Sequence, residues 1–322
     1  MHIKDILDDS EGPTISFEFF PAKTAASRAK LRETIETLSA ANPAFVSITY
    51  GAGGSTREAT QELVRHVKGN TALTPVPHFT CVNHSRDEID ATLRDYAGMG
   101  IGNVLALRGD APRDRPDHDH GTDFCRHATD LVRYIRQFNA TGVHPDHRGF
   151  GIGVAGFPEG HPATPNRLLE IDYLKAKVDA GADYICTQLF FDNRDFYDFV
   201  ERCDVAGIRI PILAGILPIT SIASLKRMSE LAAGARVPGK LLRRLFEAKD
   251  NESVYKIGID HASEQCADLY RNNISGIHFY TLDQADPTLE ILGRIENGMA
   301  TIPGRLNPAP AMPSERAKIR AV

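Results

Sequence analysis

The chain has 322 residues, a formal net charge of −5 and an isoelectric point near 6.2, so its charge does not favour a nucleic-acid-binding surface. No apolar run approaches the roughly 18 residues of a membrane-spanning helix, and the acidic start MHIKDILDDSEG lacks the layout of a signal peptide. The five cysteines are odd in number and form no CxxC pair. We therefore expect reduced thiols and a cytoplasmic protein.

Short apolar runs alternate with helical patterns along the chain. The segments that resemble strands are 14–20, 45–49, 77–82, 103–107, 151–156, 184–190, 211–216 and 276–280. The helical patterns span 27–41, 56–68, 85–99, 122–139, 167–181, 193–206, 221–233, 238–272 and 285–297. Strands that alternate with helices predict parallel pairing through right-handed crossovers.

The number of strands favours a closed barrel. Eight parallel strands close a (β/α)8 TIM barrel, so we expect a single α/β barrel over residues 1–301, with an extra helical stretch before the last strand. An open doubly wound sheet is the structural alternative. Residues 302–322 are rich in Pro, Ala and charge, and are expected to form a disordered tail.

The first predicted strand, TISFEFF, carries one carboxylate among aromatic residues. Alternation puts Phe17 and Phe19 on one face and Glu18 on the other, close to the end of the strand at Pro21. Burying an unpaired carboxylate is costly and favours its protonated form. Two roles stay open for Glu18: a structural acid paired with a cation, or a proton donor in a site.

Polar side chains gather near the carboxyl ends of the first six strands. In a (β/α)8 barrel, the reactive groups lie at these ends and in the loops that follow. After Glu18, they are Thr49, Tyr50, His78, Thr80, Arg108, Asp110, Glu159, His161, Gln188 and Asp192. The strand starts carry no comparable set, so the sequence predicts an active site on one rim.

Two motifs are weaker. GIGVAG matches a dinucleotide-binding glycine pattern, but the prolines of the following FPEGHP prevent the required helix. These glycines are expected to form a strand that a ligand can approach closely. The loop 113–121 offers Asp117, His118, Asp119 and His120, yet adjacent residues seldom point at one ion. We expect a solvated loop and no metal.

Several segments, in the same order, resemble the methylenetetrahydrofolate reductase family, specifically its short bacterial type. They are SFEFFP, FVSITYGAGG, PHFTCV, LALRGD, LKAKVDAGADYICTQLFFD, GILPI and HFYTL. The resemblance implies a (β/α)8 barrel that holds FAD. NADH or NADPH would reduce the flavin, which would pass a hydride to 5,10-methylenetetrahydrofolate in a ping-pong scheme. The product, 5-methyltetrahydrofolate, serves one-carbon and methionine metabolism. Family members commonly assemble as dimers or tetramers.

The resemblance also implies residue roles. Glu18 matches the proton donor that helps open the folate's five-membered ring to an iminium, and Asp110 matches the carboxylate that stabilises this cation. Gln188 matches an amide that contacts folate. The positions that match flavin contacts are Thr49, Tyr50, Ala52, His78, Arg108, Gly109, Asp110, Phe157, His161, Glu170 and Lys177.

The chain departs from the family pattern at six positions. With the family residue in parentheses, they are Phe157 (Tyr), Glu170 (Asp), Ala176 (Arg), Ser224 (Gln), Met228 (Phe) and Gln284 (Arg). The first three bear on how tightly FAD is held. Ser224, Met228 and Gln284 are expected to contact the folate or the nicotinamide, and bear on how these are bound.

Alternatives to the flavin reductase remain. One is the same reaction by direct hydride transfer without a tightly bound flavin, and another is a non-catalytic folate- or flavin-binding barrel. Retention of Glu18 and Asp110 argues against a pure binder, which would gain nothing from a costly buried acid. The family segments argue against a flavin barrel that oxidises an amine such as proline. NADH and NADPH are not distinguished.

Overall fold

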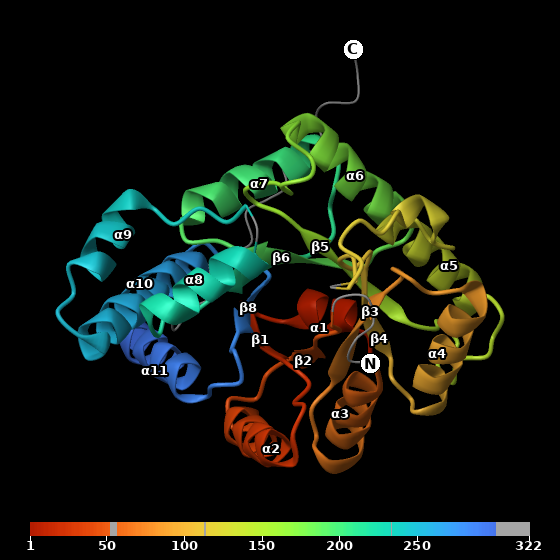
Figure 1. The fold of residues 1–322 in the computed structure, drawn as a ribbon, viewed down its shortest axis with the longest axis horizontal. Coiled ribbons are helices and arrows are strands. Elements are labelled where there is room, and N and C mark those ends of the chain that lie inside the picture. Colours follow the sequence, from red (N-terminus) through yellow and green to blue (C-terminus); the bar gives the residue numbers. More distant parts are fainter. Residues whose placement is uncertain (52–56, 113, 233, 301–322) are drawn as a thin grey trace.

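The computed structural model describes residues 1–51, 57–112, 114–232 and 234–300. Eight parallel strands close into a barrel in chain order, with β8 paired to β1 (Figure 1). The strands are β1 (Thr14–Phe19), β2 (Phe45–Ile48), β3 (Pro75–Thr80), β4 (Asn103–Leu107), β5 (Gly151–Gly156), β6 (Tyr184–Leu189), β7 (Ile212–Ile216) and β8 (Gly276–Tyr280). The predicted α/β barrel is confirmed, and each predicted strand is present. Residues 302–322, expected as a disordered tail, lie outside the described residues.

Helices surround the barrel and connect successive strands (Figure 1). They are α2 (Ala25–Ser39), α3 (Arg57–Asn70), α4 (Arg86–Gly98), α5 (Ala128–Asn139), α6 (Arg167–Asp179), α7 (Asn193–Val205), α8 (Ile222–Leu231), α9 (Gly239–Phe246), α10 (Asn251–Arg271) and α11 (Asp286–Ala300). Across the described ranges, no helix combines the length and apolarity needed to cross a membrane.

Two predicted helices differ from the structure because of local capping. The predicted helix 122–139 begins only at Ala128, since the preceding residues form a 3-10 turn and the N–H of His127 donates to Oδ2 of Asp130 at 3.1 Å. The predicted stretch 238–272 is two helices. Oδ1 of Asp250 accepts the N–H of Ser253 at 2.8 Å and so caps a new helix, α10.

A short helix that the sequence did not predict, α1 (Ile3–Asp9), closes the amino-terminal end of the barrel. Ile3 is fully buried and packs in one cluster with Phe45 and Leu105 from the strands. The N–H of Ile3 donates to Oδ1 of Asn103, at the start of β4, at 2.9 Å. In Figure 1, α1 lies in the middle of the ring of helices. Any site open to solvent must therefore lie at the opposite end.

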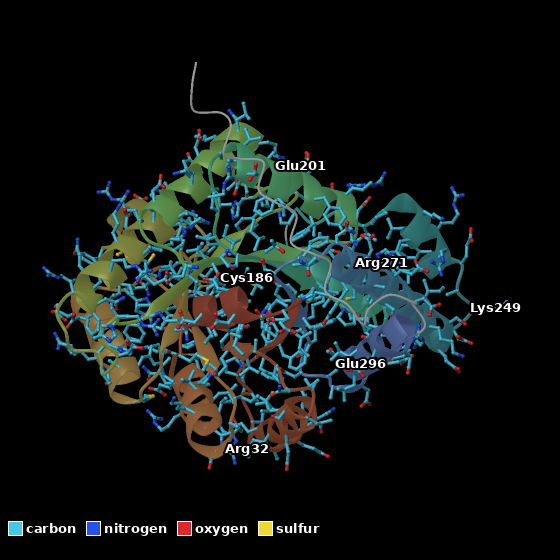
Figure 2. The ribbon with its side chains drawn as sticks, turned by 180° about the vertical axis from the view of Figure 1, so that it is seen from behind. Arg32, Cys186, Glu201, Lys249, Arg271 and Glu296 are labelled. Atoms are coloured by element: carbon cyan, nitrogen blue, oxygen red, sulfur yellow. The ribbon has the colours of Figure 1, made fainter. Side chains whose placement is uncertain are left out.

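Alternation along the strands separates an apolar outer layer from a more polar interior. Phe17 and Phe19 join the large cluster between the strands and the helices, whereas Glu18 lies on the opposite face of β1. Figure 2 shows Cys186 in the middle of the barrel, while Arg32 and Lys249 lie at its periphery. The face predicted for Glu18 is therefore the interior of the barrel.

The glycines of β5 make room for protein side chains, which corrects the expectation that they admit a ligand. A Cβ at Gly153 would lie 2.4 Å from Cζ of Tyr184, and one at Gly156 would lie 2.8 Å from Cζ of Phe199. These spaces are already filled. The strand itself is confirmed, and no helix follows it directly, so the dinucleotide-binding pattern was rightly rejected.

Candidate active site

The carboxylate of Glu18 lies in the barrel near the end of β1 and has one ion-pair partner among the described residues. Nε2 of His78 lies 3.3 Å from Oε2 of Glu18, and both side chains are buried. The geometry does not make a hydrogen bond, so Nε2 of His78 has no hydrogen-bond partner within the described chain. No described Arg or Lys pairs with Glu18. The cation that a structural acid would require is therefore not provided there.

A second histidine, His278 on β8, is held as a neutral ring below Glu18. Its Nδ1 lies 2.8 Å from Oγ of Ser16, and its Nε2 lies 3.1 Å from Oγ of Ser47. Burial lowers the pKa of His278 to about 4, although the Glu18 carboxylate acts in the opposite direction. The ring is therefore uncharged at neutral pH and adds no positive charge to the site.

Tyr280 is the next inward residue on β8, and its hydroxyl donates to the carbonyl oxygen of Thr187 at 2.7 Å. Neither His278 nor Tyr280 was predicted as a site residue. The sequence did contain a pattern that could have identified them. In GIHFY, alternation puts Ile277 on the face that packs against the helices and puts His278 and Tyr280 on the opposite, inward face.

The loop after β8 fixes the backbone around Glu18. Thr281 donates its hydroxyl to the carbonyl oxygen of Glu18 at 2.6 Å, and Oδ1 of Asp283 accepts the N–H of Phe20 at 2.9 Å. Burial raises the pKa of Asp283 to about 6, and the nearby Glu18 contributes to this rise. Leu282 and Asp283 have φ angles of 48° and 58°, which non-glycine residues seldom adopt.

Arg108 and Asp110 follow β4, and within the described chain their charged groups form no hydrogen bond or ion pair with another side chain. Arg108 is half-buried and Asp110 is exposed. Gly109, between them, has a φ of +88°, and a Cβ there would lie 2.6 Å from Cγ1 of Val82. The turn thus requires glycine, and it places a cation and an anion on the rim where both are available to a ligand.

The loop after β5 is anchored to α6. Oε2 of Glu170 accepts the backbone N–H of His161 at 3.3 Å, and the Phe157 ring meets the His161 ring edge-on at 4.9 Å. Nδ1 of His161 accepts the N–H of Ala163 at 3.1 Å, so the neutral ring carries its proton on Nε2. Burial lowers the pKa of His161. The residue therefore offers an Nε2–H donor at neutral pH.

Lys177 of α6 reaches the end of β5, where its ammonium donates to the carbonyl oxygen of Ala155 at 2.6 Å. Burial lowers its pKa to about 8, while the Glu170 carboxylate opposes the shift. Arg108 and Lys177 both act electrostatically on His161. These three residues form a group of donors at the ends of β4 and β5.

The other predicted contacts are spread around the rim. Thr49 and Tyr50 follow β2, and the Tyr50 hydroxyl lies 3.0 Å from Nε2 of His84. Gln188 of β6 accepts the N–H of the next residue at 2.9 Å through Oε1. That bond leaves the amide nitrogen of Gln188 able to donate to a ligand. Ala52 lies outside the described residues.

The residues predicted at the folate and the nicotinamide have different surroundings. The Ser224 hydroxyl donates to the carbonyl oxygen of Ser221 at 2.8 Å, inside the capping box that begins α8. Met228 is buried in the apolar cluster that also contains Leu225. Gln284 is exposed in the loop after β8. Gln284 thus lies near the rim, whereas Ser224 is the third helical residue of a capping box and Met228 packs in a core.

Two other rim acids have cationic or backbone partners. Oδ2 of Asp192 lies 2.6 Å from Nη2 of Arg194. Both carboxylate oxygens of Glu159 accept the backbone N–H of Arg236 at 3.0 Å. Glu159 thus joins the loop after β5 to the segment after α8, whereas Asp192 caps α7. Both roles are structural.

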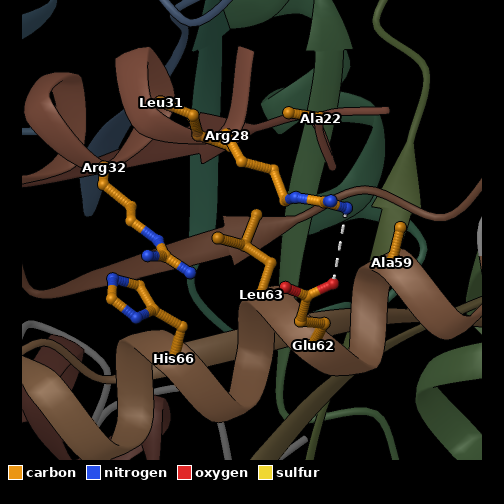
Figure 3. Close-up of a pocket in the computed structure, with 8 residues that line it drawn as sticks. All are labelled: Ala22, Arg28, Leu31, Arg32, Ala59, Glu62, Leu63 and His66. Carbon is orange, nitrogen blue, oxygen red and sulfur yellow. Dashed lines mark ion pairs between the residues drawn. The ribbon is translucent and has the colours of Figure 1, made fainter. Parts of the chain in front are cut away.

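A small recess between α2 and α3 lies on the outside of the barrel (Figure 3). Nη1 of Arg28 lies 3.7 Å from Oε2 of Glu62 across it. Burial and the neighbouring Arg32 lower the pKa of His66 on the same wall. None of the predicted site residues lines this recess, so it contributes nothing to the candidate active site.

The fold and the side chains at the strand ends define a class of protein. It is a (β/α)8 barrel with a buried acid at the end of β1 and a group of cationic and imidazole donors at the ends of β4 and β5. The family model described as methylenetetrahydrofolate reductase matches residues 2–296. The chain belongs to the methylenetetrahydrofolate reductase family, and the resemblance seen in the sequence is confirmed.

Individual relatives give the same result. The chain is 34% identical over 281 residues to 5,10-methylenetetrahydrofolate reductase of Escherichia coli (strain K12). This match covers 86% of this chain and 88% of that protein. It is 37% identical over 310 residues to methylenetetrahydrofolate reductase 1 of Schizosaccharomyces pombe, and 38% identical over 302 residues to methylenetetrahydrofolate reductase (NADH) 1 of Arabidopsis thaliana. These two matches cover 94% and 90% of this chain, but 50% and 49% of the relatives. The chain thus spans about half the length of these eukaryotic proteins.

A solved structure supports the fold alone. An uncharacterized protein from Clostridium thermocellum, which binds two copies of 5-methyl-5,6,7,8-tetrahydrofolic acid, superposes with a TM-score of 0.66 at 15% sequence identity. The match covers 93% of this chain and 99% of that chain.

Proposed function

We propose that this protein reduces 5,10-methylenetetrahydrofolate to 5-methyltetrahydrofolate with NADH or NADPH as the hydride donor. FAD would be bound to the protein and would react with the nucleotide and the folate one after the other. Family membership supports the reaction. The observation that carries the proposal is the buried carboxyl of Glu18, which no described Arg or Lys neutralises and which lies at the barrel end where reactive groups gather.

The described residues fit a flavin dinucleotide. When bound, FAD supplies a carrier that accepts a hydride from the nicotinamide and gives it to the folate. Arg108, Lys177 and the Nε2–H of His161 offer donors suited to a pyrophosphate and the ribitol hydroxyls. His78 Nε2 and Thr80 Oγ1 are buried polar atoms without hydrogen-bond partners in the described chain, as expected at a surface that a ligand completes.

The reaction needs one hydride and one proton for each folate. Glu18 would donate the proton to the folate nitrogen that leaves when the five-membered ring opens. The carboxylate of Asp110 would stabilise the iminium cation formed on the folate, and Gln188 would hydrogen-bond the pterin edge. Hydride addition to that cation then gives the methyl group.

Assembly and location are further parts of the proposal. We propose a homo-oligomer, a dimer or a tetramer, and a cytoplasmic protein. Three apolar side chains on α6, Leu168, Leu169 and Tyr173, are 78%, 38% and 52% exposed, and this face would be covered by a second copy. The five buried, unpaired cysteines are compatible with a reducing compartment.

The function is tested by incubating the purified protein with methylenetetrahydrofolate and either nucleotide, and quantifying 5-methyltetrahydrofolate by mass spectrometry. One product molecule for each NAD(P)H consumed supports the proposal. Parallel double-reciprocal lines would support the ping-pong order. Ligand binding without product from either nucleotide would instead favour a non-catalytic folate- or flavin-binding barrel.

A further inference from the structure

A cluster of metal-ligand side chains lies in the loop between β4 and α5, separate from the proposed proton donor. Nε2 of His118 lies 2.9 and 3.1 Å from the two carboxylate oxygens of Asp123, and Nδ1 of His120 lies 3.2 Å from Oδ2 of the same residue. One ligand atom from each of the three side chains lies within 4.8 Å of the others. Asp123 falls just outside the loop 113–121 that the sequence singled out.

The separations match those of ligands around one small cation. Zinc binds imidazole nitrogen and carboxylate oxygen at about 2.0–2.2 Å in tetrahedral sites, which puts neighbouring ligand atoms about 3.3 Å apart. The two imidazole rings are nearly perpendicular, at 88°, so they approach the carboxylate from different directions. Small side-chain rotations would open the hydrogen-bonded cluster to metal-ligand distances.

Burial makes the charge of Asp123 costly without a cation. The side chains of Asp123 and His118 are 4% and 8% exposed. Within the described ranges, only the two histidines form ion pairs with this carboxylate. The backbone N–H of Asn83 donates to its Oδ1 at 2.9 Å, which orients the carboxylate as outer partners do in metal sites. A divalent cation bound to the three side chains would neutralise this carboxylate.

We propose that His118, His120 and Asp123 bind a divalent transition metal of the zinc type through Nε2, Nδ1 and Oδ2. Two nitrogens and one oxygen suit zinc or cobalt better than magnesium or calcium, which prefer all-oxygen sites. The His120 side chain is 21% exposed, which gives the metal an entry path and room for a water ligand. Because Asn83 belongs to the loop after β3, the bound metal would lock the loops after β3 and β4 together.

The site is tested with cobalt and zinc on the chelator-treated full chain. One equivalent of Co²⁺ should produce the intense visible absorption of a tetrahedral nitrogen and oxygen site, and Zn²⁺ should displace it. The His118→Ala/His120→Ala variant should bind both metals at least ten-fold more weakly. The matched control is His147→Ala, because that side chain is 92% exposed and lies outside the cluster.

A second variant guards against misfolding. Asp123→Asn keeps the shape but removes the charge, so it should retain the circular dichroism of the wild type and lose the cobalt absorption. Zn²⁺ should raise the melting temperature of the wild type and of His147→Ala, but not that of the cluster variants. Equal metal affinity in the wild type and the double variant would overturn the proposal, as would no stoichiometric binding to the wild type.

Discussion

Nε2 of His78 lies 3.3 Å from Oε2 of Glu18 inside the barrel, so the partner of this buried acid is an imidazole. A buried Arg or Lys would be a permanent cation beside the carboxylate, whereas an imidazole is a cation only when both of its ring nitrogens carry protons. This arrangement does not supply the permanent cation of a fixed salt bridge among the described residues. It therefore supports the proposed role of Glu18 as a proton donor.

Replacing Glu18 with Gln should remove the proton donor while preserving shape. We expect Glu18→Gln to lower kcat by about 100-fold or more, because general acid catalysis contributes on this scale. The folate dissociation constant, measured by calorimetry, should change much less. Glu33→Gln, an exposed substitution on α2, is the matched control. Full turnover in Glu18→Gln would show that another group donates the proton.

His278 should make folding stability depend on pH. Its pKa in the folded protein is about 4, below the ordinary value of 6.5, so the unfolded chain binds the proton first as the pH falls. The stability present above pH 6.5 should be lost progressively towards pH 4, by up to about 3 kcal/mol. Asp283 acts in the opposite direction because burial raises its pKa to about 6.

The contribution of His278 is isolated by urea unfolding of the wild type and His278→Gln at several pH values. Asp283 titrates in both proteins, so the difference between their unfolding free energies reports the histidine. That difference should shrink between pH 6.5 and pH 4. A difference that stays constant across this window would contradict the buried neutral imidazole.

Gly109 should tolerate no side chain. Gly109→Ala combines a φ of +88° with a Cβ only 2.6 Å from Val82, whereas Gly142→Ala has a φ of +70° and nothing within 4 Å. We expect Gly142→Ala to cost about 1–2 kcal/mol from the backbone alone. Gly109→Ala should cost at least about 1 kcal/mol more, from overpacking. Equal costs in thermal or urea unfolding would show that the clash at Gly109 relaxes freely.

Lys177 should make flavin binding depend on pH. Its pKa of about 8 means that the ammonium is charged at neutral pH and loses its charge as the pH rises through 8. FAD affinity, measured by flavin fluorescence, should therefore fall above pH 8 in the wild type. Lys177→Met should bind FAD at least ten-fold more weakly at pH 7 and lack this step. Lys175→Met is the control, because that side chain is 34% exposed and pairs with Asp179 on the same helix. A step that persists in Lys177→Met would refute the assignment.

The sequence predicted the fold well because strand alternation and helix periodicity are local signals. The positions of Glu18, Arg108 and Asp110 followed from the rule that reactive groups lie at the ends of barrel strands. What it missed depends on distant contacts. The role of α1 depends on Asn103, about a hundred residues away.

Two further features needed coordinates. The sequence predicted that the glycines of β5 leave room for a ligand, but in the structure the Tyr184 side chain occupies the space beside Gly153. The histidine loop looked solvated because Asp123, which draws His118 and His120 together, lies beyond the stretch that the spacing highlighted. In both cases, the deciding partner is fixed by tertiary structure and not by the local pattern.

The most direct test of the proposed flavin reductase is the visible spectrum of the purified protein during anaerobic additions. We predict a flavin band that bleaches with NADH or NADPH and recovers when methylenetetrahydrofolate is added. A flavin that neither nucleotide reduces, or that stays reduced in the presence of the folate, would contradict the account. A colourless protein that still oxidises NAD(P)H with this folate would instead establish direct hydride transfer and contradict the role of FAD.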